Sequence, residues 1–154
     1  MRDIVHFFNC KNMYQYKGGK EVNIRQFMKT IYLGDRGLKE IVIDSYNNEI
    51  KLKIDCISRI RDSEGMWNYY NDENIEDGYI VFSDIQTFSL EPKGVIPNDY
   101  INDWKCEEID KGIYEIVFNI GSYNSEMQYQ ETIICIHAKN ICLEDTSNNT
   151  RIYE

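Results

Sequence analysis

The sequence predicts one mainly β or α+β domain spanning residues 1–154, with about seven or eight mostly antiparallel strands in a twisted sheet, sandwich or partial barrel. Runs that alternate apolar and polar residues recur along the chain and are joined by short polar turns, which is typical of strands with one wet face. Aromatic residues make up 13% of the 154 residues, and such residues favour strands. This length suits a single hydrophobic core.

One amphipathic helix is expected near residues 23–33. Its apolar positions follow the helical repeat and are Ile24, Phe27, Met28 and Ile31. Asn23 is a suitable N-cap, and Gly34 a suitable stop. A second, short helical turn is expected near residues 97–105, because Pro97 suits the first turn of a helix.

Strands are expected in the rest of the chain, and the segments with the clearest alternation are 38–46, 49–56, 79–90, 114–120, 129–138 and 140–143. Asn47 and Asn48 separate the first two segments, and asparagine tolerates the positive φ of a tight hairpin turn. No repeat or linker divides the chain, so a single domain is the simplest organisation.

Charge is unevenly distributed along the chain. The net charge is −9, with a pI near 4.8, which disfavours nucleic acid as a partner because phosphate binding needs lysine and arginine. Residues 62–110 hold 13 acidic residues against Lys93 and Lys105. Acidic loops that carry large aromatics suit a basic protein partner, since carboxylates steer association and aromatics anchor the complex. The alternative is a solvated acidic face above aromatics that fill the core.

The expected partner-binding surface is residues 62–78, with a contribution from residues 97–110. Its expected contact residues are Trp67, Tyr69, Tyr70, Asp72, Glu73, Glu76, Asp77 and Trp104.

The cysteines indicate a reducing environment. Their odd number and scattered positions argue against a disulfide framework and against a zinc ribbon; they are Cys10, Cys56, Cys106, Cys135 and Cys142. We therefore expect reduced, mostly buried thiols in a cytoplasmic protein. Cys135 and His137 share one face of an expected strand, but the apolar run around Cys135 favours a buried core thiol over a catalytic pair.

No cofactor or metal is expected, and no catalytic residue is assigned. The acidic stretch from Asp72 fails the calcium-loop pattern, because Asp77 takes the position that requires glycine and Ser83 the position of the bidentate glutamate. Arg59 and Arg61 share a strand face, from which they could pair with carboxylates of the acidic segment. No apolar run is long enough to span a membrane or to form a signal peptide.

Several short motifs occur in an order that resembles a known family. They are YLGDRG (32–37), ISRIR (57–61), WNYY (67–70), GYIVF (78–82) and PNDYI (97–101). Over roughly residues 24–145 the chain resembles an uncharacterised family of small bacterial proteins known as a domain of unknown function, which implies no activity. Its layout is also similar to that of β-rich immunity proteins of bacterial polymorphic toxin systems, which implies a toxin domain as partner.

These observations favour a non-enzymatic protein-binding module, such as an immunity protein that neutralises a basic toxin domain. A β-rich carrier of a small ligand and an enzyme without a recognisable motif are the alternatives.

Overall fold

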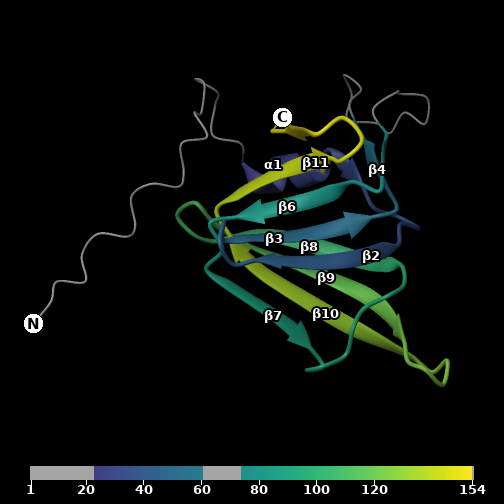
Figure 1. Ribbon diagram of the computed structural model, residues 1–154. Coiled ribbons are helices and arrows are strands. Elements are labelled where there is room, and N and C mark those ends of the chain that lie inside the picture. Colours follow the sequence, from purple (N-terminus) through teal and green to yellow (C-terminus); the bar gives the residue numbers. More distant parts are fainter. Residues whose placement is uncertain (1–22, 61–73, 154) are drawn as a thin grey trace, which may run out of the picture.

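The computed structural model describes residues 23–60 and 74–153 (Figure 1). Within these ranges the chain forms one short helix and twelve antiparallel strands in three sheets, which confirms the mainly β class. The elements are α1 (Ile24–Lys29), β1 (Ile31–Tyr32), β2 (Leu38–Asp44), β3 (Glu49–Ile54), β4 (Cys56–Arg59), β5 (Ile75–Glu76), β6 (Tyr79–Ser83), β7 (Thr87–Glu91), β8 (Ile101–Asp110), β9 (Ile113–Tyr123), β10 (Tyr129–Ala138), β11 (Asn140–Asp145) and β12 (Thr150–Ile152).

Two larger sheets enclose the core. One has five strands in the order β12-β11-β6-β3-β2, and the other has four in the order β7-β10-β9-β8. In Figure 1 the labelled strands of the five-stranded sheet lie above β9, β10 and β7. Inward side chains of both sheets form one cluster, in which Phe82 and Phe118 meet edge to face with ring centroids 6.2 Å apart. This burial supplies the main driving force for folding.

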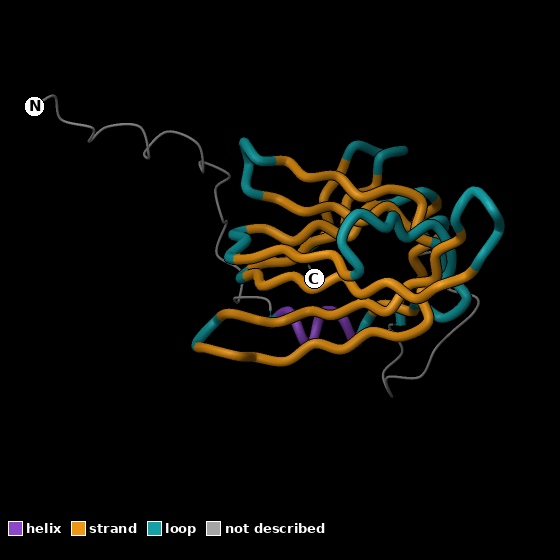
Figure 2. The backbone as a smooth tube through the Cα atoms, turned by 90° about the horizontal axis from the view of Figure 1, so that it is seen from below, coloured by secondary structure: helices purple, strands orange, loops and turns teal. Residues whose placement is uncertain are grey.

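The two sheets are joined at a shared corner by short connections between strands. Figure 2 shows the strands and the loops between them from below. β6 is followed directly by β7, and β10 is followed directly by β11. The paired strands β6 and β11 of the five-stranded sheet are therefore each connected to one of the paired strands β7 and β10 of the four-stranded sheet. Backbone hydrogen bonds cross the corner, from Gln86 N to His137 O (2.8 Å) and from Lys139 N to Ser83 O (3.3 Å). Elsewhere, a bridge between Gly37 and Tyr100 links the start of β2 to the start of β8.

The helix is shorter than the sequence predicts. Its buried face and its Asn23 cap are confirmed, since the Asn23 side chain accepts a hydrogen bond from Gln26 N. The helix ends at Thr30, however, and Ile31 and Tyr32 form a strand that pairs with β4. A β-branched and an aromatic residue gain more from this pairing than from a further helical turn.

The prediction of a helical turn near residues 97–105 is wrong. Residues 101–110 form the long strand β8, which pairs with β9 along most of its length. Cys106 points inward while Lys105 and Glu107 point outward, and this alternation outweighs the helix-start signal of Pro97. The number of described strands also exceeds the expected seven or eight. Strands as short as β1, β5 and β12 have too few residues to show an alternating pattern, so the sequence did not predict them.

Arg59 lies buried on β4, where it holds α1 against the small sheet β1-β4-β5. Its Nη2 donates a hydrogen bond to Thr30 Oγ1 (3.0 Å), and its guanidinium lies 5.1 Å from the centroid of the Phe27 ring. Arg61 and residues 62–73, the first part of the acidic stretch, lie outside the described residues, so the predicted pairing of the two arginines with these carboxylates stays a prediction.

An ion-pair network covers the outer face of the five-stranded sheet. Arg151 on β12 binds the buried Glu49 of β3 through two hydrogen bonds of 2.7 and 2.9 Å, and also binds Glu144 of β11. Lys51 completes the network with Nζ–O distances of 3.1 Å to Glu144 and 3.7 Å to Glu49. The network ties the C-terminal strand to the middle of the sheet.

The four cysteines of the described ranges are free thiols. Cys106 and Cys142 are buried, while Cys56 and Cys135 are half-buried. Burial raises the pKa of Cys106 to about 11 and that of Cys142 to about 12, so both are inert thiols at neutral pH. Among the described helical residues, none forms a helix long and apolar enough to cross a bilayer.

Candidate functional site

The structure places three of the eight predicted partner-binding residues. Glu76 is exposed on β5, and Asp77 follows it in a turn, where it forms an ion pair with Lys39 (2.5 Å). Trp104 is half-buried on β8 and packs against the core. The remaining five lie outside the described residues, and they are Trp67, Tyr69, Tyr70, Asp72 and Glu73.

A more extensive acidic surface lies on the outer face of the four-stranded sheet. Five carboxylates from its four strands share this face, and they are Glu91, Asp103, Glu107, Glu115 and Glu131. Lys105 is the basic side chain of β8 on the same face. We call the five carboxylates, together with the outward residues of β9 and β10 between them, the acidic sheet face.

Strand geometry explains why these residues meet. Alternate residues of a strand point to opposite faces, so burying one face of each strand fixes which residues point to solvent. On β10 the inward residues Ile134 and Ile136 are fully buried, and Cys135 and His137 therefore point outward. The register then places Glu115 of β9 directly opposite His137.

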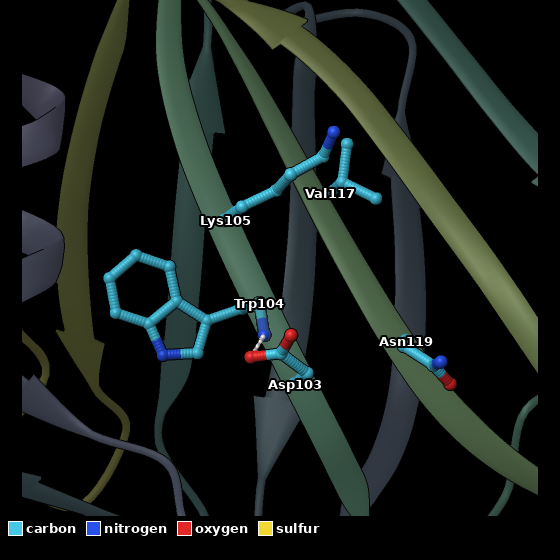
Figure 3. A pocket seen from close by; sticks show the side chains of 5 residues that line it. All are labelled: Asp103, Trp104, Lys105, Val117 and Asn119. Carbon is cyan, nitrogen blue, oxygen red and sulfur yellow. Dashed lines mark hydrogen bonds between the residues drawn. The ribbon is translucent and has the colours of Figure 1, made fainter.

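A shallow pocket of about 110 Å³ interrupts the acidic sheet face (Figure 3). Asp103, Trp104, Lys105, Val117 and Asn119 line it. Figure 3 shows Lys105 and Val117 side by side, with the indole of Trp104 pointing away from them. Drug-sized ligands occupy pockets of about 300–1,000 Å³, so this pocket suits a single side chain of a partner better than a small-molecule cargo.

Two exposed tyrosines continue the acidic sheet face at the tip of the β9–β10 hairpin. Tyr123 and Tyr129 are 40% and 48% exposed, and their rings meet edge to face with centroids 5.3 Å apart. Gly121 allows this packing, because a Cβ there would lie only 2.8 Å from Tyr129 Cε2. Tyr129 is further held by its hydroxyl, which accepts a hydrogen bond from Asn102 Nδ2 (3.0 Å). The pair offers rigid aromatic area beside the carboxylates.

Three chemically different side chains converge on the acidic sheet face near the end of β10 and the start of β9. His137 Nε2 lies 3.0 Å from Glu115 Oε2, and Cys135 Sγ donates a hydrogen bond to the same oxygen over 3.7 Å. The hydrogen bond and the charge of His137 lower the pKa of Glu115, and burial together with the Glu115 carboxylate raises the pKa of Cys135. The expectation that Cys135 is a buried core thiol is wrong, since it faces outward and is half-buried.

Comparison with known sequences identifies the chain's relatives. The sequence pattern of a family of unknown function, DUF6258, matches residues 22–154. The chain belongs to this family. The match confirms the resemblance to an uncharacterised family and extends it to residue 154. Membership in the family assigns no activity.

Neither the curated proteins nor the solved structures contain a significant match to the chain. The candidate site therefore rests on the geometry described above.

Sequence reasoning missed most of the acidic sheet face. Its carboxylates come from strands that lie far apart in the sequence, between residues 91 and 131, and only strand register brings them together. The alternation of polar and apolar residues does predict which residues of each strand point outward, as in Lys105-Cys106-Glu107. The pairing of β8, β9 and β10 was the missing information.

Proposed function

We propose that the protein is a non-enzymatic protein-binding module that engages a basic partner through the acidic sheet face. The observation that carries the proposal is the gathering of five carboxylates, with one lysine, on the outer face of the four-stranded sheet. A surface whose charges have one sign creates an electrostatic potential that raises association rates and selects partners of the opposite charge. The partner we propose presents lysine and arginine side chains.

The aromatic end of the face supports the same proposal. Binding energy at protein interfaces is concentrated in a few anchors, among which tyrosine is enriched. Tyr123 and Tyr129 are exposed, pack on each other and adjoin the carboxylates. Steering and anchoring groups therefore occupy one continuous surface.

The partner class we propose is a basic toxin domain, which is the class that the predicted resemblance of the sequence layout to immunity proteins implies. The predicted acidic aromatic segment 62–78 would form a second contact region. The first partner to test is a toxin-like protein encoded next to this one, because immunity genes lie beside their toxin genes.

The test is affinity capture with three charge-reversed chains. The first carries Glu91→Lys, Asp103→Lys and Glu131→Lys on the acidic sheet face, and the second carries Glu76→Lys in the predicted segment. The third carries Glu40→Lys on the opposite sheet and controls for a charge reversal outside both regions. Far-UV circular dichroism verifies that each chain folds.

The proposal expects a basic protein that is captured by the wild-type chain and by the Glu40→Lys chain but is lost from the first chain. Capture that the first chain retains in full would show that the acidic sheet face is not the interface. Loss with the Glu76→Lys chain alone would instead locate the interface in the predicted acidic segment.

A further inference from the structure

Glu115, Cys135 and His137 have the donor atoms of a metal site. Their carboxylate oxygen, thiol sulfur and imidazole nitrogen all lie within 4.8 Å of one another. The two distances recorded to Glu115 Oε2 are 3.0 Å from His137 Nε2 and 3.7 Å from Cys135 Sγ. Three ligand atoms from two paired strands thus surround one point on the acidic sheet face.

These separations fit tetrahedral zinc. Zinc bonds of about 2.3 Å to sulfur and about 2.0–2.2 Å to nitrogen or oxygen imply ligand–ligand distances of roughly 3.4 Å for nitrogen–oxygen and roughly 3.6 Å for sulfur–oxygen. The observed distances are within a few tenths of an ångström of these values. The third separation, between the ligand atoms of Cys135 and His137, is at most 4.8 Å.

The backbone explains the placement. Cys135 and His137 are two residues apart on β10, so they share a face, and Glu115 is the cross-strand partner of His137 on β9. All three side chains are half-buried, which leaves a side open to solvent. We propose that Glu115, Cys135 and His137 bind a Zn²⁺ ion, with a water molecule in the fourth position.

Charge and ligand chemistry favour a transition-metal ion such as zinc over the hard divalent cations. A thiolate and an imidazole exclude the hard cations Mg²⁺ and Ca²⁺, which take oxygen ligands. A carboxylate and a thiolate together balance the charge of one divalent ion. The small number of histidines is no obstacle, because this ligand set needs only one.

A thiol nucleophile is the competing interpretation of the same residues. A nucleophilic cysteine needs a neighbouring base that lowers its pKa. Here Glu115 Oε2 lies within hydrogen-bonding distance of both other groups, and the thiol donates its hydrogen bond to this carboxylate oxygen. A thiol that donates to a carboxylate is not paired with a base that activates it, whereas a bound zinc ion would take the sulfur as a thiolate.

Lys105 provides an internal test of the site. It lies on the same face of the neighbouring strand β8, opposite Val117, and its charge acts on both Glu115 and Cys135. Repulsion between this ammonium and a bound cation weakens binding, so Lys105→Gln should tighten it.

Titration of the full-length protein with Co²⁺, followed by competition with Zn²⁺, tests the proposal. Cobalt in a zinc site with a thiolate ligand gives a sulfur-to-metal charge-transfer absorption band. We expect one equivalent of Co²⁺ to bind and to give this absorption band, and we expect Zn²⁺ to displace the bound Co²⁺, so that the band disappears. Loss of an outer-shell partner costs about 10–100-fold in affinity, so Cys135→Ser or His137→Gln should cost at least about 100-fold.

Cys56→Ser is the matched control, because Cys56 is also a half-buried free thiol but lies on β4. It should bind cobalt as the wild-type chain does. A thiolate band that persists in Cys135→Ser would overturn the proposal, and so would the absence of the band at every Co²⁺ concentration that the protein tolerates.

A measurement on the unmodified chain removes any dependence on how the variants fold. Zn²⁺ should slow alkylation of Cys135 by iodoacetamide, read by peptide mass spectrometry, and leave alkylation of Cys56 unchanged. Equal rates at Cys135 with and without Zn²⁺ would refute the site.

Discussion

Removing Arg151 should destabilise the protein by about 2 kcal/mol. Glu49 is only 7% exposed, and Arg151 is its bidentate partner at 2.7 and 2.9 Å. Removal of one partner from a buried ion pair costs about 3–5 kcal/mol. We expect less because the Arg151 side chain is 30% exposed and because Lys51 remains 3.7 Å from Glu49. Arg151→Met is the best variant, since methionine keeps an apolar stem over the sheet.

The assay is a double-mutant cycle measured by urea unfolding of the wild-type chain, Arg151→Met, Glu49→Gln and the double variant. We expect a coupling energy of about 1–2 kcal/mol, because each single variant leaves a buried group without its partner. Coupling below about 0.5 kcal/mol, the range of independent sites, would refute the reasoning.

The exposed pair formed by Lys39 and Asp77 supplies the control for this cycle. Asp77→Asn keeps a residue that tolerates the positive φ of 53° at this position. Its coupling to Lys39 should be too small to resolve, because solvent screens the charges. Coupling as large as that of the Arg151 pair would show that burial is not what gives the network its strength.

Three further outcomes follow from the structure. Phe118→Ala should lower the free energy of unfolding by about 3–5 kcal/mol, measured in urea, because Phe118 is fully buried against Phe82. Hydrogen bonds from Ser147 and Asn148 lower the pKa of Asp145, so its stabilising effect is present above the unfolded pKa of about 3.9 and is lost as the pH falls through the lower folded pKa. The stability difference between wild type and Asp145→Ala should therefore shrink between about pH 6 and about pH 3, and a constant difference would contradict this. Peptide mass spectrometry should find the buried thiols Cys106 and Cys142 unalkylated in native protein at pH values where the half-buried thiols react.

Local signals in the sequence predicted the elements that depend on neighbouring residues. Asn23 caps the helix as expected. The turn between β2 and β3 falls at Asn47 and Asn48, and Asn48 has the positive φ of 55° that its residue type allows. Each of these features depends on residues within one turn of the chain, so a single sequence contains the information.

Tertiary pairing decided the features that the sequence did not predict. Pro97 suggested a helical turn, but the following residues gained a partner strand in β9. The apolar run around Cys135 suggested a core position on both faces, yet Ile133 is 36% exposed and Cys135 faces outward with it. An apolar run shows that a strand is partly buried, and the strands that cover it determine which face is wet.

The candidate site shows the same division. The spacing of Cys135 and His137 predicted that they share a face, and β10 confirms it. Glu115 could not be added, because its position opposite His137 depends on the register between β9 and β10. Composition directed the prediction to residues 62–78, but none of the five carboxylates of the acidic sheet face lies there. Three of them lie between residues 91 and 107, and two lie beyond residue 110.

The association rate of a captured partner tests the central claim most directly. Surface plasmon resonance would compare the wild-type chain with the chain that carries Glu91→Lys, Asp103→Lys and Glu131→Lys, over a series of salt concentrations. We predict that the charge reversal lowers the association rate by about tenfold or more at low salt, and that added salt narrows the gap as the charges are screened. Equal association rates at low salt would contradict the account.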